Sequence, residues 1–353
     1  MDMVFKLLRA NNGDAIHLRT KDGKGVFYNI LIDGGTGETY SYKNKKGKPE
    51  DGELKQLIEH IKNQNEFIDL LILTHIDDDH IGGILKWFSK DETAINLISE
   101  IWFNSGASIK KHLNNAEAEV TSIKFKEQAT LTSIKQGVDF EKYIKDKRVW
   151  DGKIINREKI LNWNNLSFQI LSPSNEKLEI LLKEWTKKAP ESLLDTSRTN
   201  EHKKTFKKLI EEDSFIEDTS HYNGSSIAFI LKHLNLNYLF LGDSHPTDII
   251  KELRRLGYSE NNKLIVEFIK IAHHGSAKNN PIELFRLIDT NKYVISTNGN
   301  QHDHPDKLTL ARIVTANPKA IFYFNYPHLI DKVILREDVI DYPKVQYLAA
   351  DKL

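Results

Sequence analysis

Short apolar runs that end at Gly or at an acidic residue recur along the chain and predict core strands. The runs 28–32 and 238–241 are rich in β-branched and aromatic residues, which favour pleated, half-buried segments. Each is too short for a typical helix and ends at Asp or Gly-Asp, as strands that enter a turn do. Further runs of this kind cover 70–73, 101–103, 166–171, 268–272 and 293–296.

The amino-terminal segment shows a different pattern, with apolar and polar residues in alternation over residues 3–33. Turn-forming residues at 11–14 and 21–25 interrupt the alternation, which predicts an antiparallel hairpin arrangement. Residues 36–50 are polar and rich in Gly and Lys. We expect them to form an exposed loop near the functional site.

Apolar residues at helical spacing predict helices between the strands. The predicted helices cover 53–63, the segment that follows Gly83, 247–255 and 281–287. Residues 107–217 carry many charges and are mostly helical in pattern, with one strand-like run inside. We interpret this range as a helical insertion, which is a candidate surface for a protein partner or for nucleic acid.

The run 70–73 ends in a turn that is rich in metal-ligand side chains. Crowded carboxylates repel each other and lose hydration, and a divalent cation removes both costs. Imidazole suits Zn, Mn, Fe and Co, and carboxylate oxygen suits the harder ions of that set. The alternative interpretation is a solvated acidic turn with two incidental histidines. The residues of the turn are His75, Asp77, Asp78, Asp79 and His80, followed by Gly82 and Gly83.

Two other strand ends carry acids, and a third carries adjacent histidines. Asp33 and Asp243 each follow an apolar run, where Asp is also a common turn former. His273 and His274 follow the run 268–272. Adjacent residues of a strand point to opposite faces, so we expect at most one of the two to bind metal directly. The other is a candidate proton donor or phosphate contact.

In chain order, these segments resemble the motifs of the metallo-β-lactamase superfamily. His75-x-Asp77-x-Asp79-His80 resembles the HxHxDH motif with Asp77 in place of the second His, a form similar to the competence-type (ComEC-like) branch. The resemblance extends from residue 14 to residue 306. The other motifs are Asp33-Gly34-Gly35, Asn223-Gly224-Ser225-Ser226, Gly242-Asp243, His273-His274-Gly275-Ser276 and His304-Pro305.

This resemblance implies a fold and a domain organisation. The implied fold is a four-layer αββα sandwich of the α/β class with a helical insertion. The hydrolase domain is expected over residues 1–330, with the insertion at about 107–217. Residues 331–353 are then a C-terminal extension of the same domain.

The resemblance also implies two divalent metal ions, Zn or Mn, and a set of ligands. His221 lies at the offset of a family ligand, but the competence-type branch often lacks that His, so a ligand role and a structural role both stay open. Asp33 is expected to support the metal-binding loop without contacting the metal itself. Asp78 is expected to be solvated. The implied metal ligands are His75, Asp77, Asp79, His80, His221, Asp243, and His273 or His274.

Candidate catalytic residues follow from the same motifs. They are Asp79, His273, His274 and His304. His304 precedes Pro305 as in the family's His-Pro element and is a candidate substrate contact, whereas His302 is expected to be exposed.

Composition narrows the functional classes. The chain of 353 residues has 50 Lys and Arg against 50 Asp and Glu, so its formal net charge is zero. Global charge therefore gives no signal for nucleic acid, although a local basic groove stays open. The absence of Cys excludes disulfides, Fe–S clusters and a Cys nucleophile. The amino terminus lacks a signal-peptide pattern, and no run is long enough for a membrane span, so we expect a cytoplasmic location.

The expected function is metal-dependent hydrolysis by a dinuclear centre, with a phosphodiester such as DNA or RNA as substrate. Two close cations activate a bridging water and clamp the attacking and leaving oxygens of a phosphoryl centre. Asp77 adds a carboxylate, which favours Mn alongside Zn. The alternatives are hydrolysis of a small phosphoester, lactone or amide, or a metal-binding partner subunit whose hydrolase site has decayed.

Overall fold

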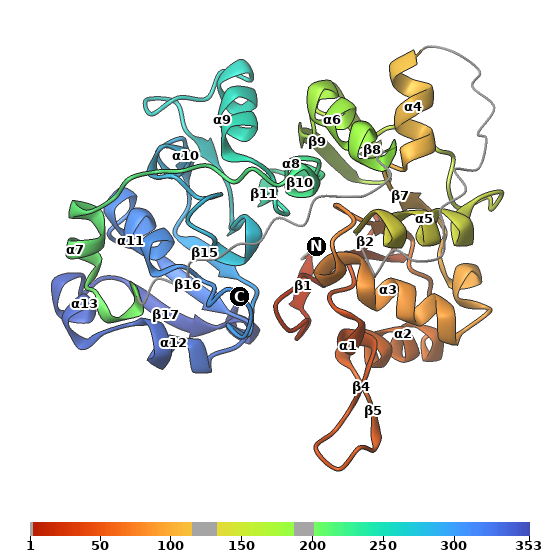
Figure 1. The fold of residues 1–353 in the computed structure, drawn as a ribbon, viewed down its shortest axis with the longest axis horizontal. Helices are drawn as coiled ribbons and strands as arrows, with labels where there is room; N and C mark the ends of the chain where they lie inside the picture. Colours follow the sequence, from red (N-terminus) through yellow and green to blue (C-terminus); the bar gives the residue numbers. More distant parts are fainter. Residues whose placement is uncertain (1–2, 115–132, 187–200) are drawn as a thin grey trace. The chain divides into compact units, whose positions relative to one another are not determined.

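The computed structural model describes residues 3–114, 133–186 and 201–353, and the chain divides into two compact units (Figure 1). The first unit comprises Met1–Asn156, Pro173–Leu194 and Ser220–Ser225, and the second comprises Arg157–Ser172, Asp195–Thr219 and Ser226–Leu353. Each unit has its own hydrophobic core. Both combine a sheet with helices, which confirms the predicted α/β class.

The first unit is built on a five-stranded sheet in the order β1-β2-β3-β6-β7. Strands β1 to β3 pair antiparallel, as the alternating pattern predicts, whereas β3, β6 and β7 run parallel. Strand β6 is buried along its whole length, as expected of a continuous apolar run in a parallel sheet. The strands are β1 Val4–Leu7, β2 Ile16–Lys21, β3 Phe27–Ile32, β6 Leu70–Ile72 and β7 Ile101–Trp102.

The helices of the first unit include one that matches its prediction at both ends and one that does not. Helix α2 (Glu53–Asn63) buries the four apolar residues of its periodic face. Helix α3 (Asp78–Lys90) begins five residues before Gly83, so Asp78 lies in a helix and not in an extended segment. Acidic residues in a first helical turn interact favourably with the helix dipole. The remaining helices are α1 Gly37–Tyr40, η1 Ala94–Leu97, α4 Gly106–Asn114, α5 Ser133–Ile144, α6 Asn175–Thr186 and α8 His221–Gly224.

The expected exposed loop over residues 36–50 is instead ordered structure. It forms helix α1 followed by an antiparallel hairpin of β4 (Ser41–Lys43) and β5 (Pro49–Asp51). Figure 1 shows this hairpin extending away from α1 and α2 of the same unit. The polar composition indicates exposure, and the hairpin is exposed. It gave no strand signal because a short two-stranded ribbon pairs its backbone groups without an apolar face.

The second unit is built on an eight-stranded sheet in the order β17-β16-β15-β13-β11-β10-β9-β8. The five strands from β11 to β17 are parallel, and β8 to β11 are antiparallel. The strands are β8 Ile160–Trp163, β9 Leu166–Ser172, β10 Ala228–His233, β11 Leu236–Phe240, β13 Ile269–Lys270, β15 Lys292–Ile295, β16 Ile321–Phe324 and β17 Gln346–Ala349, and a separate pair is β12 Leu264–Ile265 and β14 Ile288–Asp289.

Helices of the second unit pack with this sheet around a core of aliphatic and aromatic side chains. Helices α9 and α10 match the predicted segments 247–255 and 281–287 to within a residue. The helices are η2 Glu201–Lys203, α7 Phe206–Glu211, α9 Pro246–Arg255, η3 His273–Gly275, α10 Ile282–Arg286, α11 Lys307–Ala316, α12 His328–Val333, α13 Arg336–Asp341 and η4 Ala350–Lys352.

The predicted helical insertion over about 107–217 is not one block. Its described residues supply α4, α5 and α6 to the first unit, and β8, β9 and α7 to the second. Parts of this prediction, at 115–132 and 187–200, lie outside the described residues. The segment 331–353 is integral to the second unit, because β17 pairs in parallel with β16 along four residues.

Among the residues that the structure describes, no helix combines the length and the apolar character that crossing a membrane requires.

A buried ion pair connects three helices of the second unit. Lys307 Nζ at the start of α11 lies 2.6 Å from Asp338 Oδ2 on α13, and both side chains are fully buried. The same carboxylate accepts hydrogen bonds from the backbone N–H groups of Phe206 on α7 (2.7 Å) and Leu335 (3.0 Å). Asp338 thus satisfies a buried ammonium, a buried amide and a partly buried amide at once.

We predict that Asp338→Ala destabilises the protein by about 3–5 kcal/mol, because the substitution leaves a buried ammonium without its counter-charge. The measurement is the free energy of unfolding by chemical denaturation. The matched control is Asp341→Ala on the same helix, which breaks the solvent-accessible pair between Lys207 and Asp341 (2.7 Å) and should cost less than about 1 kcal/mol. Equal losses in the two variants would contradict a special role for the buried pair.

Candidate metal centre

The loops after β3 and β6 form one functional element because these strands are parallel neighbours. Their register pairs Ile32 with Ile72, so the segments that follow leave the same edge of the sheet. Asp33 lies directly after β3, with a positive φ of 58°. Thr74 and His75 follow β6, and α3 then begins at Asp78.

Asp33 is a buried acceptor that holds this loop together. Its carboxylate accepts hydrogen bonds from the backbone N–H of Thr74, from the Thr74 hydroxyl and from His80 Nδ1, each at 2.7 Å. Burial raises the pKa of the Asp33 carboxyl, and the His80 ring and the Thr74 donors oppose that shift. With Nδ1–H donated to Asp33, the lone pair of His80 lies on Nε2, the nitrogen available to a metal.

We call His75, Asp77, Asp79 and His80 the first donor group. The two imidazole rings are buried and their centroids are 4.1 Å apart, and His75 Nε2 lies 3.7 Å from Asp77 Oδ2. Asp77 and Asp79 are partly exposed. The structure therefore brings together the four residues of the HxDxDH segment that the sequence analysis selected as ligands.

Polar residues distant in sequence orient the carboxylates of this segment. Asp77 Oδ1 accepts a short hydrogen bond from the Ser133 hydroxyl, and Asp79 Oδ2 accepts one from Asn12 Nδ2 at 3.0 Å. The remaining acid, Asp78, is exposed as expected, and its carboxylate accepts from Gln136 Nε2 at 2.6 Å.

Close backbone packing fixes the first turn of α3 against its neighbours. A Cβ at Gly83 would lie 2.0 Å from the carbonyl oxygen of Gly34, and a Cβ at Gly13 would lie 1.8 Å from that of Asp79. Either contact is far shorter than van der Waals separation, so both positions require glycine. The glycines thus allow the loops around residues 13 and 34 to contact the helix directly.

The second unit holds a corresponding arrangement, which we call the second donor group: Asp243, His273 and His274. Strands β11 and β13 are parallel neighbours with Leu239 opposite Ile269, so Asp243 and His273 stand at the same distance beyond the sheet. Asp243 is buried, and its Oδ2 lies 3.7 Å from Nε2 of His273 and 3.7 Å from Nε2 of His274.

Both histidines therefore face the same carboxylate, contrary to the expectation that they point to opposite faces. That expectation assumed a strand, whereas His273 and His274 lie in the turn η3 with φ values of 45° and 53°. Non-glycine residues in this region are rare and are commonly held there at functional sites. The geometric reason for allowing only one of the two as a ligand no longer applies.

Each of these rings is oriented through its Nδ1 atom. His274 Nδ1 donates to the backbone oxygen of Ser296 at 2.9 Å, and His273 Nδ1 donates to Asn279 Oδ1 at 2.9 Å. The amide of Asn279 in turn donates to the backbone oxygen of Asp243 at 3.1 Å and to Asp218 Oδ2 at 3.1 Å. Such outer contacts are typical of histidines that bind metal through Nε2.

The electrostatics of the second donor group favour positive charge. Burial alone lowers the pKa of His273, but the carboxylates of Asp243 and Asp218 outweigh burial and raise it to about 10.

His304 lies beside this group, and His302 does not join it. The ring centroids of His304 and His273 are 5.4 Å apart, and His304 Nδ1 lies 3.4 Å from Asp306 Oδ1. His302 is exposed, as the sequence analysis expects. His304 therefore lies beside the second donor group.

His221 lies on α8, in the first unit. Its Nδ1 donates to Glu184 Oε1 on α6 at 3.0 Å, and its side chain is 46% exposed, whereas that of Glu184 is 9% exposed. A carboxylate on Nδ1 is compatible with a metal ligand and with a purely structural contact, so both interpretations of His221 stay open.

Sequence reasoning missed the residues that orient the ligands: Asn12, Ser133, Gln136, Glu184, Asp218, Asn279 and Ser296. Three of them lie near segments that the sequence analysis selected: Asn279 close after the His273-His274 turn, Asp218 three residues before His221, and Ser296 at the end of the run 293–296. Ser133, Gln136 and Glu184 lie far from any motif and carry no local signal.

The chemistry of both donor groups fits divalent metal ions. Imidazole nitrogens and carboxylate oxygens are the ligands that Zn and Mn share. Each histidine is oriented through Nδ1 or faces a carboxylate. The nitrogen and oxygen donors are therefore already in place for a cation.

A family comparison bears on the segment that carries the first donor group. Residues 28–153 match the metallo-beta-lactamase superfamily. The matched segment runs from β3 through α5 and includes Asp33 and the HxDxDH residues. No curated protein matches the chain. The superfamily match supports a metal-dependent hydrolase, and the α/β architecture of both units is consistent with the metallo-β-lactamase fold.

Solved structures that match the chain include the metallo-beta-lactamase fold protein YhfI from Bacillus subtilis, with 10% identity, a TM-score of 0.43 and coverage of 98% of this chain and 96% of that one. A long form RNase Z from yeast has 10% identity, a TM-score of 0.38 and coverage of 99% and 47%. The CmlA beta-hydroxylase E377D mutant has 14% identity, a TM-score of 0.39 and coverage of 98% and 52%. Similarity at this level carries no information about the substrate of this chain.

We predict that Asp33→Asn lowers the affinity for divalent metal by about 10–100-fold, the usual cost of losing a partner of a metal-binding histidine. The amide keeps one acceptor oxygen for the three donors that the two carboxylate oxygens serve, so it holds the His80 ring and the Thr74 loop less firmly. The measurement is chelator competition on the metal-loaded protein. The matched control is Asp69→Asn at the other end of β6, where the carboxylate accepts from the backbone N–H of Asn29 (2.8 Å) and lies away from the ligand turn. Unchanged metal affinity in Asp33→Asn would refute the role of Asp33.

Proposed function

We propose that the protein is a metal-dependent phosphodiesterase, with a nucleic acid as substrate, that uses two divalent ions. The observation that carries the proposal is the repeated arrangement of donors. In each unit, two neighbouring parallel strands end together and deliver buried imidazole beside carboxylate. The assignment of both donor groups to one dinuclear centre comes from the resemblance to the metallo-β-lactamase superfamily.

The finer family assignment is also part of this proposal. Asp77 replaces the second His of the HxHxDH motif, and we therefore assign the chain to the competence-type branch. The additional carboxylate favours Mn alongside Zn on grounds of ligand hardness. The absence of Cys is compatible with the cytoplasmic location that we propose.

When bound, two such ions would lower the pKa of a shared water and neutralise charge on a phosphoryl group. The residues of this chain supply the binding and the orientation. His75, Asp77, Asp79 and His80 would hold metal from the first unit, and Asp243 with His273 or His274 from the second. His304, beside His273, would contact the phosphodiester.

We predict that Asp243→Asn lowers turnover by at least about 100-fold, or roughly 3 kcal/mol of barrier, because a neutral amide bridges cations poorly. The assay is hydrolysis of bis(p-nitrophenyl) phosphate with Mn or Zn, and circular dichroism checks the fold. The matched control is Asp289→Asn, an exposed acid at the end of β14 in the same unit, which should keep full activity. Near wild-type turnover of Asp243→Asn would exclude the dinuclear mechanism.

A separate prediction concerns His221. If His221 is a ligand, His221→Ala should remove metal from one site and leave the other occupied, while Glu184→Gln should weaken the same site less because an amide oxygen still accepts from Nδ1. Elemental analysis after reconstitution gives the stoichiometry. Unchanged stoichiometry and activity in His221→Ala would assign His221 to a structural contact with α6.

A further inference from the structure

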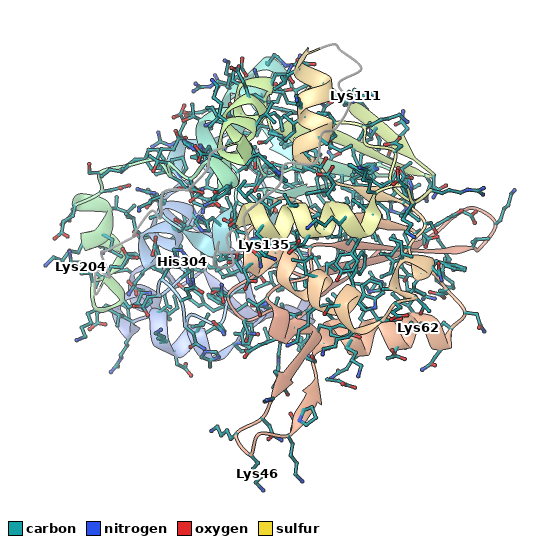
Figure 2. All side chains as sticks on the ribbon, turned by 45° about the vertical axis from the view of Figure 1, so that its right-hand side comes forward. Lys46, Lys62, Lys111, Lys135, Lys204 and His304 are labelled. Atoms are coloured by element: carbon teal, nitrogen blue, oxygen red, sulfur yellow. The ribbon has the colours of Figure 1, made fainter. Side chains whose placement is uncertain are left out.

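The β4–β5 hairpin concentrates positive charge at one point of a chain with no net charge. Lys43, Lys45, Lys46 and Lys48 fall within six residues, and all four are exposed. Figure 2 labels Lys46, at the tip of the hairpin that Figure 1 shows extending from its unit. Clusters of Lys on a projecting element are the electrostatic footprint of a polyanion site.

The acids of the hairpin do not neutralise these lysines. Asp51 pairs with Lys55 at 2.7 Å, and Glu50 accepts from Asn44 Nδ2 at 2.7 Å. Within the described part of the chain, none of the four lysines lies in an ion pair.

Another lysine-rich segment of the chain behaves differently. On and before α7, Lys204 pairs with Glu212 at 2.5 Å and Lys207 pairs with Asp341 at 2.7 Å. There the lysines form ion pairs with nearby carboxylates of the same unit, as charged residues on a solvent-exposed surface usually do. The contrast indicates that the hairpin charge is available to a partner.

The backbone of the hairpin turn is held by hydrogen bonds, so the lysines project from a fixed turn. Asn44 Oδ1 accepts from the backbone N–H groups of Lys46 (2.9 Å) and Lys48 (3.1 Å). Gly47 closes the turn with a φ of 73° and donates to the Asn44 carbonyl at 2.8 Å. A preformed turn loses little backbone entropy when its side chains bind a partner.

The base of the hairpin is attached to the helix that carries part of the first donor group. Lys86 Nζ on α3 donates to the backbone oxygen of Ser41 at 2.6 Å. Helix α1, which leads into β4, packs on α3, and a Cβ at Gly82 would lie 2.9 Å from the backbone N of Gly37. Gly82 is only two residues beyond His80, so the hairpin and the first donor group share one rigid support.

We propose that the β4–β5 hairpin binds the phosphate backbone of single-stranded nucleic acid and holds the polynucleotide beside the first donor group. This inference rests on the proposed phosphodiesterase function, because the polyanion that such an enzyme acts on is a chain of phosphodiesters. Tyr42, 38% exposed on the same hairpin, adds an aromatic ring on which a base can stack. Contacts of this kind are independent of base sequence and sensitive to salt.

The test compares two variants with the same change in charge. One carries Lys43→Ala, Lys45→Ala, Lys46→Ala and Lys48→Ala. The control carries four substitutions at exposed lysines elsewhere: Lys90→Ala, Lys110→Ala, Lys319→Ala and Lys344→Ala. The probe is a fluorescent phosphorothioate DNA oligonucleotide, which resists hydrolysis, titrated with the metal-loaded protein over a range of salt concentrations.

The hairpin variant should bind the oligonucleotide at least about tenfold more weakly than wild type at low salt. Each phosphate contact on a single strand contributes about 0.7 to the salt dependence of log K, so four lost contacts should reduce the slope by up to about 3. The control should bind as wild type does. Both variants should hydrolyse bis(p-nitrophenyl) phosphate at the wild-type rate, because the hairpin supplies no donor to the metal.

Several outcomes would overturn the inference: equal losses in both variants, no loss in the hairpin variant, or no binding by the wild type. Loss of binding to anionic phospholipid vesicles, with DNA binding retained, would assign the hairpin to a membrane surface instead. Failure of the proposed function gives a different pattern. In that case the wild type does not hydrolyse the small phosphodiester, whereas its DNA binding still depends on the hairpin lysines.

Discussion

The candidate metal centre depends on one topological constraint, the common end point of neighbouring parallel strands. The carboxyl ends of such strands meet at one edge of a sheet, so residues far apart in sequence arrive together. Asp33 reaches His80 in this way in the first unit, and Asp243 reaches His273 and His274 in the second. Gly83 and Gly13 then allow backbone to pack directly on the ligand turn. Substitutions there would separate donors without removing any of them.

The same constraint explains what the sequence could predict. An apolar run that ends in acids or histidines indicates a strand and also the end of that strand where ligands gather. The positions of β3, β6 and β11, and of the donors after them, could therefore be predicted from the sequence. Helix α2 was readable from its spacing alone. The resemblance implied that Asp33 supports the metal loop, and in the structure its carboxylate accepts three hydrogen bonds from that loop.

Other features depend on contacts that no local pattern records. Helix α3 begins at Asp78 and not after Gly83, because the backbone N–H groups of His80 and Ile81 bond to the carbonyl of Asp77. His273 and His274 have positive φ angles, so their side chains do not alternate between the two faces of a strand. The segment 36–50 pairs with itself as a hairpin, and the division into two units follows long-range packing. Residues such as Ser133 and Glu184 act across more than 35 positions of sequence.

Metal binding by the two donor groups is tested most directly by elemental analysis of the purified protein, after reconstitution with Mn or Zn and removal of loosely bound ions. We expect up to about two equivalents of transition metal per chain. Less than about half an equivalent of any transition metal after reconstitution would contradict it, whatever activity the protein shows.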